Sequence, residues 1–278
     1  MLKLSCGFAR PLNRATLTRR TISVGMYAAG QGLPQDYAQA GMWSRKAADQ
    51  GNAHAKVRLG ILYEQGLGVA QDFGEALKWY REAAEWHDGA RLLLGDMYAE
   101  GHGVPQDYAT AATWYQKAAD LGNAAAMRNL AAMSLKGNGV PQDYAAAAAW
   151  YEKAANLGDA SAENGLGSMY ERGLGVPQDN SLMISWYRKV AEQGFVAAQY
   201  NLGWKFETGR GVPQDYVLAH MWFNLAASRF RPEDSRELSQ KAIIVARDTI
   251  AAKMTSSQIS EAQRMAREWT PGASRQPP

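Results

Sequence analysis

The chain has 278 residues, of which 46% are hydrophobic and 21% are charged, and this balance is typical of a globular protein with a sizeable core. Its longest apolar runs, such as Ala145–Trp150, are far too short to cross a bilayer, which excludes an integral membrane protein. The net charge is +3, but residues 1–35 hold five basic and no acidic side chains, so the rest of the chain carries −2 and lacks the basic surface that nucleic-acid phosphates require.

Residues 1–25 form a basic leader that is rich in arginine, serine and threonine. The leader lacks the uninterrupted apolar stretch of a secretory signal, so we interpret it as a disordered N-terminus. A mitochondrial-type presequence is the alternative that fits the same composition. Cys6 is the only cysteine, which excludes an internal disulfide and a thiolate metal cluster but leaves the compartment open. A cytoplasmic location is favoured over a periplasmic or exported one.

Internal repetition follows the leader. The tripeptide Pro/Ala-Gln-Asp starts at residues 34, 70, 105, 141, 177 and 213, in steps of 36 residues with one step of 35. A column of tryptophans follows the same spacing: Trp43, Trp79, Trp114, Trp150, Trp186 and Trp222. Patterns that stay in phase over six copies indicate a repeat architecture, in which each repeat is one supersecondary unit.

Each repeat is predicted to contain two helices. The aspartate of the tripeptide suits the N-cap of the first helix, because its carboxylate can accept hydrogen bonds from free backbone N–H groups. Six residues hold this position: Asp36, Asp72, Asp107, Asp143, Asp179 and Asp215. Gln39 and Glu75 stand three places further on and predict capping boxes in two copies. Glycine near Gly51 or Gly122 is expected to end the first helix.

The second helix of each repeat carries the pattern Leu-Gly-x-x-Tyr, as in Leu59–Tyr63. Small residues on both helices allow close backbone approach, while the tryptophans and tyrosines are expected to fill the space between repeats. A single helix pair cannot bury its apolar face alone, but pairs stacked in series can. We therefore predict an all-α fold, an α/α superhelix or solenoid of antiparallel helix pairs with a period of 36 residues.

These residues resemble the Sel-one-like repeat family, which is related to the tetratricopeptide repeat. The resemblance rests on Gly-x-Gly-Val-Pro-Gln-Asp-Tyr, on Trp-Tyr-x-Lys-Ala-Ala at Trp114–Ala119 and on Leu-Gly-x-Met-Tyr at Leu94–Tyr98, and it covers residues 26–230. It implies five complete helix pairs, a sixth first helix from about Asp215 and a truncated unit ending at Tyr27. It also implies a bacterial interaction scaffold, with signalling, envelope regulation or host interaction as typical settings.

Residues 231–269 are expected to close the array as a helical cap, because a solenoid must cover its last apolar face. One capping helix is predicted from about Pro232 to Lys253. A second is predicted after Thr255, with Gln258 completing a capping box. Residues 270–278 are interpreted as a disordered tail.

The sequence predicts no catalytic, cofactor-binding or metal-binding residues. The Gly-x-Gly segments could cradle a phosphate at a helix start, but the aspartate that follows would repel an anion, and no P-loop lysine is present. The four histidines are scattered along the chain and have no ligand partner at i+4, so surface or capping roles are expected for them.

Departures from the repeat are the better candidates for partner binding. The turn Glu85–Asp88 lacks the glycine and one residue, and it contains Trp86 and His87. Phe195 replaces the usual Asn or Asp after a turn glycine, and Trp204 occupies a variable position. Aromatic residues outside the core are frequent binding hot spots. Packing against a neighbouring loop or the cap is the alternative for each of them.

The sequence therefore predicts a non-enzymatic, monomeric scaffold or adaptor that binds a protein or peptide partner along its surface. Two alternatives remain open. One is an enzyme or small-ligand protein with a site on the concave face, and the other is an RNA-binding helical array, which the charge of −2 disfavours.

Overall fold

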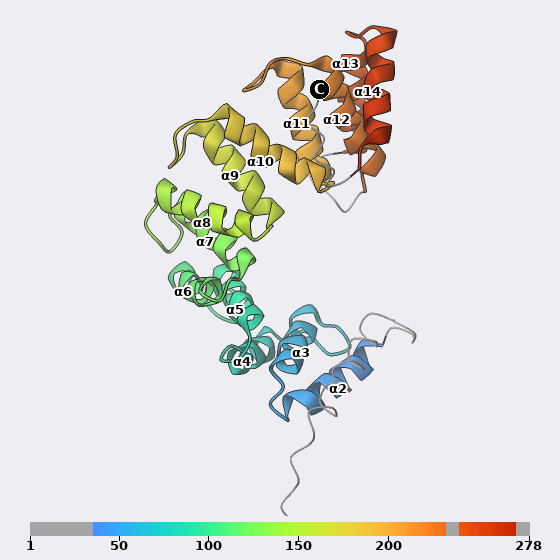
Figure 1. The fold of residues 1–278 in the computed structure, drawn as a ribbon. Coiled ribbons are helices and arrows are strands. Elements are labelled where there is room, and N and C mark those ends of the chain that lie inside the picture. The colour runs from blue at the N-terminus through green and yellow to red at the C-terminus, as the bar shows by residue number, and fades with distance from the viewer. Residues whose placement is uncertain (1–35, 232–238, 271–278) are drawn as a thin grey trace, which may run out of the picture. The chain divides into compact units, whose positions relative to one another are not determined.

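The computed structural model describes residues 36–231 and 239–270, and within these ranges it contains thirteen α-helices and no strand (Figure 1). The predicted all-α class is confirmed. The helices are α2 Tyr37–Ala48, α3 Ala53–Gln65, α4 Phe73–Ala83, α5 Asp88–Glu100, α6 Tyr108–Ala119, α7 Ala124–Lys136, α8 Tyr144–Asn156, α9 Ala160–Arg172, α10 Asn180–Glu192, α11 Val196–Thr208, α12 Tyr216–Arg229, α13 Gln240–Ala251 and α14 Ser256–Glu268.

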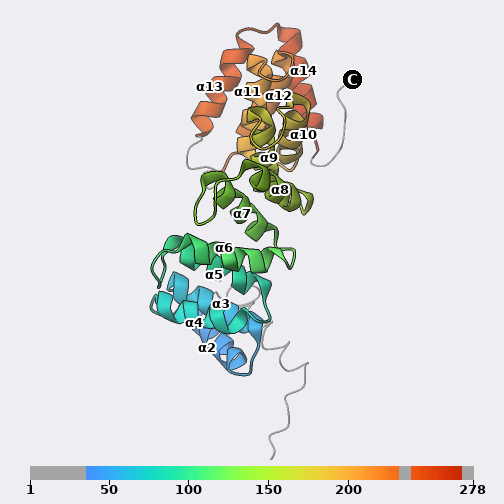
Figure 2. The ribbon, with the colours of Figure 1, turned by 90° about the vertical axis from the view of Figure 1, so that its left-hand side faces the viewer.

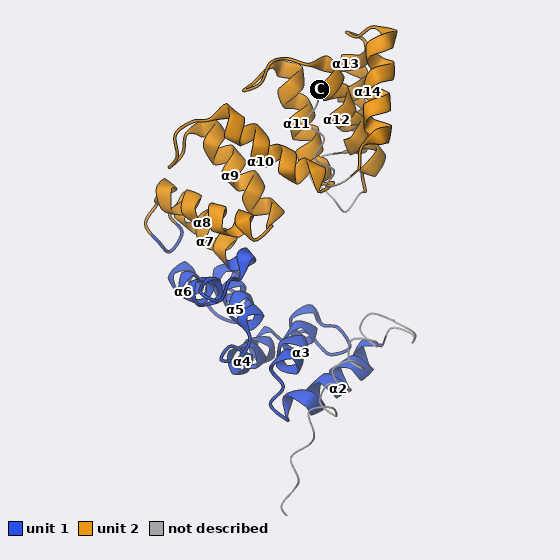
Figure 3. Ribbon diagram, in the orientation of Figure 1, with its two compact units in different colours: residues 1–126, 138–140 blue, residues 127–137, 141–278 orange. Residues whose placement is uncertain are grey.

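The chain divides into two compact units (Figure 3). Unit 1 comprises residues 1–126 and 138–140, and unit 2 comprises residues 127–137 and 141–278. In unit 1, α3 packs against α2 and α4, and α5 packs against α4 and α6. In unit 2, α8 to α12 pack in series, and α13 and α14 both pack against α12 (Figure 2). In chain order the described helices form the five predicted pairs and a sixth first helix, α12, while the truncated unit ending at Tyr27 lies outside the described residues.

The first helix of each pair begins at the repeated aspartate. Asp107 Oδ1, for example, accepts a hydrogen bond of 3.0 Å from the backbone N–H of Thr110, and each of the other five aspartates makes an equivalent bond. The capping boxes predicted at Gln39 and Glu75 are not formed, and the Glu75 carboxylate lies 3.5 Å from the Lys78 ammonium instead. A complete capping box joins Thr255 and Gln258 at the start of α14.

The six tryptophans lie at two depths. Trp79 and Trp222 are buried, whereas the other four are half-buried, each with a lysine ammonium over its ring: Trp43 with Lys46, Trp114 with Lys117, Trp150 with Lys153 and Trp186 with Lys189. The residue that follows five of the six tryptophans is a buried aromatic ring: Tyr80 and Tyr115 in unit 1, and Tyr151, Tyr187 and Phe223 in unit 2. The small residues of the second helices make room for these rings.

Both α13 and α14 pack on α12, and α13 is shorter than the first helix predicted for this region. It begins at Gln240, where Ser239 Oγ accepts a hydrogen bond from the backbone N–H of Ala242, and it ends at Ala251 rather than Lys253. The predicted helix from Pro232 to Lys253 is therefore not continuous, because Ser239 has extended backbone and is the N-cap at which α13 begins. None of the described helices is both long and apolar enough to span a bilayer.

Candidate binding surfaces at the turns between paired helices

The turns that join the first and second helix of a pair carry exposed apolar side chains. In unit 1, Trp86 is 77% exposed and Leu121 is 59% exposed. In unit 2, Leu157 is 56% exposed and Phe195 is 50% exposed. Apolar surface of this size in successive equivalent turns has no packing role within either unit, and such patches commonly mark interaction sites. We call these segments the turn edge of each unit.

Three of the turns have ordinary caps. Asn52, Asn123 and Asp159 precede the second helices α3, α7 and α9, and each side-chain oxygen accepts a hydrogen bond from a backbone N–H three residues later. The first helix ends just before, with glycine in the left-handed region, such as Gly122 at φ 85°. These turns match the sequence prediction for helix ends.

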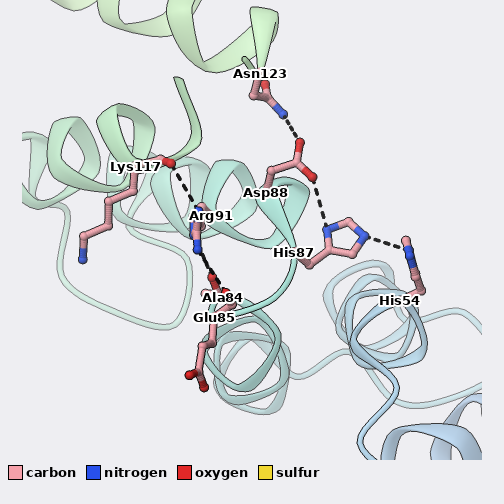
Figure 4. A network of polar contacts seen from close by, with 8 residues as sticks. All are labelled: His54, Ala84, Glu85, His87, Asp88, Arg91, Lys117 and Asn123. Carbon is pink, nitrogen blue, oxygen red and sulfur yellow. Dashed lines mark hydrogen bonds and ion pairs between the residues drawn. The ribbon is translucent and has the colours of Figure 1, made fainter. Parts of the chain in front are cut away.

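The turn at Trp86 is held in a different way. His87 occupies the N-cap of α5 but makes no capping bond, and the usual glycine is missing. Arg91 compensates from inside α5 (Figure 4). Its Nε donates to the Ala84 carbonyl at 2.7 Å and its Nη2 donates to the Glu85 carbonyl at 3.1 Å. The guanidinium thus satisfies the carbonyls at the end of α4, which otherwise lack intrahelical partners.

The turn at Phe195 shows the same solution. Phe195 is the N-cap of α11 and makes no capping bond, while Gln199 Nε2 donates to the Ala191 carbonyl at 3.0 Å. Gln199 and Arg91 both lie four residues after the N-cap, and Ala191 and Ala84 hold equivalent places at the ends of α10 and α4. In both turns a side chain of the second helix therefore donates to a carbonyl at the end of the first helix, while the N-cap residue makes no side-chain hydrogen bond.

Phe195 also borders an open hollow of about 210 Å³ between α9, α10 and α11. The other lining residues are Ala160, Ser161, Asn164, Val190, Ala197, Ala198 and Asn201. None of these side chains titrates, so the hollow offers apolar contact with a few amide and hydroxyl groups. Such a lining suits an apolar side chain of a partner better than it suits acid–base chemistry.

The structure brings together two histidines that are 33 residues apart in the sequence. His54 Nδ1 and His87 Nε2 lie 2.9 Å apart, so one nitrogen is protonated and donates a hydrogen bond to the other. His87 Nδ1 lies 4.0 Å from a carboxylate oxygen of Asp88, whose other oxygen accepts a hydrogen bond from Asn123 (Figure 4). The interpretation of the histidines as scattered is wrong for this pair.

Burial lowers the pKa of His87 below its ordinary value, and the neighbouring His54 lowers that pKa further, while Asp88 acts in the opposite direction. The hydrogen bond from Asn123 lowers the pKa of the Asp88 carboxyl, which favours its ionised form. Near neutral pH the turn that carries the exposed Trp86 ring thus contains a neutral His87 imidazole and an ionised Asp88 carboxylate.

The other two histidines have separate environments. His102 stacks on Phe73 with 4.6 Å between ring centroids. His220 is buried, which contradicts the expected surface or capping role, and its pKa is lowered by burial and then by Arg247 of α13. Among the described residues, no three histidine, cysteine, aspartate or glutamate side chains come close enough to hold a metal ion.

Trp204 differs from the other candidates because it is only partly exposed. It packs against the hydrophobic core of unit 2, and its ring is covered by the Arg210 guanidinium at 4.8 Å and approached by the Lys205 ammonium at 5.6 Å. It also lies nine residues after Phe195 on α11, a rise of about 13 Å along the helix. Trp204 and Phe195 therefore do not form one patch.

Sequence reasoning missed Leu121 and Leu157 because they occur in turns that otherwise fit the repeat. Their spacing from Trp86 was a signal that could have been used, since all three hold the same place after the first helix. The roles of Arg91 and Gln199 had no such signal, because a helical side chain does not reveal which carbonyl it contacts.

The Sel1 repeat model matches residues 24–52, 53–85, 89–123, 124–159, 160–195 and 196–229. The chain belongs to the Sel1 repeat family. Sel1 repeats are a protein-interaction repeat, and the match spans most of the chain. Residues 86–88 of the shortened turn fall between two matched segments.

A Sel1 repeat protein from Oxalobacter formigenes has a similar crystal structure, with a TM-score of 0.72 and 37% sequence identity over 78% of this chain and 89% of that one. Immunity protein Pa5087 from Pseudomonas aeruginosa shares 22% identity over 81% of this chain and 89% of that one, with a TM-score of 0.46. A protective antigen present in uropathogenic Escherichia coli strains shares 24% identity over 92% of this chain and 84% of that one, with a TM-score of 0.40. The comparison with curated proteins finds no match.

Proposed function

We propose that this Sel1 repeat protein is a non-enzymatic scaffold that binds a protein or peptide partner through its turn edges, with Trp86 in unit 1 and Phe195 in unit 2 as the main contact residues. The observation that carries the proposal is the 77% exposure of Trp86 on a turn that Arg91 holds in place. A large aromatic ring presented on a fixed backbone loses little conformational entropy on binding, and truncating such a ring commonly costs about 2–4 kcal/mol of binding free energy.

The proposal assigns separate roles to the segments of the chain. Residues 26–230 would form the interaction array, and residues 231–269 would cover its last apolar face. In unit 2 this agrees with the packing of Met265, Ala266 and Trp269 of the cap against the core that contains Trp222. The leader, residues 1–25, lies outside the described residues. Signalling or regulation is the role that such an adaptor would serve.

Crosslinking affinity capture from cells of the source organism tests the proposal. The full chain is expressed with an affinity tag, and the recovered partner is quantified by mass spectrometry. We expect Trp86→Ala and Phe195→Ala each to lower recovery of the partner at least about tenfold, because each removes a desolvated aromatic contact. Melting temperatures should remain at the wild-type value, since both side chains are exposed.

Matched controls are available in each unit. Met42 is 42% exposed on α2 and Leu182 is 40% exposed on α10, and neither lies on a turn edge. Met42→Ala and Leu182→Ala should leave recovery unchanged. Equal recovery with wild type, Trp86→Ala and Phe195→Ala would refute the turn edges as the binding surface.

A further inference from the structure

We infer that the turn edge of unit 1 recognises a cationic partner segment in which an arginine or lysine stands beside an apolar side chain. This inference rests on the proposed function and names the partner chemistry for one of its two surfaces. We call the surface formed by Glu85, Trp86, Asp88, Asp120 and Leu121 the Trp86 edge. Two observations support the inference. The turns themselves carry negative charge, and the neighbouring lysine and arginine side chains contact groups other than the carboxylates of this edge.

The turns of unit 1 are acidic. Residues 49–52, 84–88 and 120–123 contain Asp49, Glu85, Asp88 and Asp120 but no lysine or arginine. Each exposed apolar residue directly follows a carboxylate, Trp86 after Glu85 and Leu121 after Asp120. Because these groups share one edge of successive repeats, their negative potentials add along it.

Three basic side chains of the helices that flank this edge make other contacts. Arg91 donates to the Ala84 and Glu85 carbonyls and, at 3.4 Å, to the Lys117 carbonyl. Lys56 pairs with Glu82 at 3.0 Å, and the Lys117 ammonium lies 4.2 Å from the centre of the Trp114 ring. None of these three cations forms an ion pair with a carboxylate of the Trp86 edge.

The His87 imidazole adds no opposing charge near neutral pH. His54 and His87 bond to each other at 2.9 Å, and burial lowers the pKa of His87. The indole face of Trp86 can therefore accept a guanidinium or ammonium group, while Glu85 and Asp88 supply the carboxylates for an ion pair. Leu121 offers an apolar contact in the next turn. The edge thus combines an aromatic face, carboxylates and an aliphatic side chain, which together fit a segment that is both cationic and apolar.

The turn edge of unit 2 provides an internal comparison. The Asp159 carboxylate is held by Arg128 at 3.1 Å, so it is already paired. Arg229 stands beside the turn glycine Gly194, which precedes Phe195. Because this edge carries cations of its own, we expect it to contribute little to charge selection.

Three labelled peptides test the inference with the full chain. Each has 18 residues and forms an amphipathic helix with a leucine face, and the opposite face carries arginine, glutamine or glutamate. We expect the arginine peptide to bind at least about tenfold more tightly than the glutamine peptide at low salt, and the glutamate peptide not to bind. Raising the salt concentration should weaken only the arginine peptide, because screening acts on exposed charges.

Variants locate the effect. Trp86→Ala should weaken the arginine peptide about tenfold or more. The double variant Glu85→Gln with Asp120→Asn keeps the size of both side chains and should abolish the preference for arginine over glutamine. Glu192→Gln and Phe195→Ala, in the turn edge of unit 2, should change the arginine peptide affinity less than about twofold. Circular dichroism melts establish that each variant is folded.

Equal binding of the arginine and glutamine peptides by the wild-type chain would overturn the inference, as would an arginine preference that survives the double charge variant. If Trp86→Ala then still prevents partner capture in cells, the proposed function stands and only the partner chemistry is wrong. If Trp86→Ala leaves partner capture unchanged, the proposed function fails at this edge whatever the peptides show.

Discussion

A glycine and a tyrosine set the distance between consecutive repeats. A Cβ atom added at Gly60 of α3 would lie 2.4 Å from a ring carbon of Tyr80, and at Gly95 of α5 it would lie at the same distance from Tyr115. Tyr80 is fully buried, so its ring has no free space into which to move. The glycine of the pattern Leu-Gly-x-x-Tyr is therefore needed because the tyrosine ring of the next repeat packs directly against it.

We expect Gly60→Ala to lower the free energy of unfolding by about 1–3 kcal/mol, because overpacking outweighs the better helix propensity of alanine. Gly41→Ala is the matched control. Its added Cβ would meet its nearest neighbour, Leu62, at an ordinary 3.7 Å, so it should be neutral or stabilising by up to about 1 kcal/mol. Urea denaturation of both variants checks the prediction. A Gly60→Ala variant as stable as Gly41→Ala would contradict it.

At the scale of elements, the turn between α4 and α5 depends on a side chain that lies outside it. Arg91 donates to the Ala84 and Glu85 carbonyls in this turn, whereas a glycine and a capping asparagine form the corresponding helix ends elsewhere in unit 1. This allows the turn to be one residue shorter and to present Trp86 outward. Helix α4 still ends at Ala83, although the turn that follows it lacks the glycine that ends the first helix in the other pairs.

Arg91→Met keeps the aliphatic stem and removes the donors, which leaves the Ala84 and Glu85 carbonyls without their partner. We expect it to lower the free energy of unfolding by about 1–3 kcal/mol. Lys56→Met is the control at the same place in α3, where the side chain forms a partly exposed ion pair with Glu82, and it should cost less than about 1 kcal/mol. Thermal melts of the two variants compare these losses of stability. Equal losses would show that Arg91 acts only as a surface charge.

Much of the fold could be predicted because it is encoded locally. Asp107 caps the helix that starts directly after it, and Thr255 does the same for α14, so the residue types alone indicate these ends. The candidate surfaces were harder to predict, because they depend on contacts between distant residues. The bond between His54 and His87 spans 33 residues, and nothing in either helix alone indicates it. Trp204 stands out in the sequence as clearly as Trp86, and only burial separates them.

At the scale of the whole molecule, acid should destabilise the folded chain through the half-buried His87 and the buried His220. Burial is the main cause that lowers the pKa of both His87 and His220. A group with a lowered pKa in the folded state stays neutral there while the unfolded chain takes up a proton, beginning near the ordinary histidine pKa of about 6.5. The free energy of unfolding should therefore fall as the pH drops through this region.

His220→Leu tests this dependence in unit 2. The equivalent places in α4 and α10 hold Leu77 and Ile184, so leucine suits the site. His220 faces Arg247 and Asp248 of α13, and the variant leaves both in place. We expect the melting temperature of the wild type to fall between about pH 7.5 and about pH 5.5, and that of His220→Leu to fall less. An identical fall in both proteins would rule out His220 as a source of the acid sensitivity.

The dependence of the Trp86 turn on Arg91 has a consequence for protein engineering. Repeat proteins are attractive for transplanting binding loops, because every module has the same frame. Here a graft of the four residues Glu85–Asp88 alone would carry the indole but not the guanidinium that fixes its backbone. A functional transplant must therefore be discontinuous, with an arginine four residues beyond the new N-cap. Homologous modules that share the short loop but lack this arginine would make poor recipients.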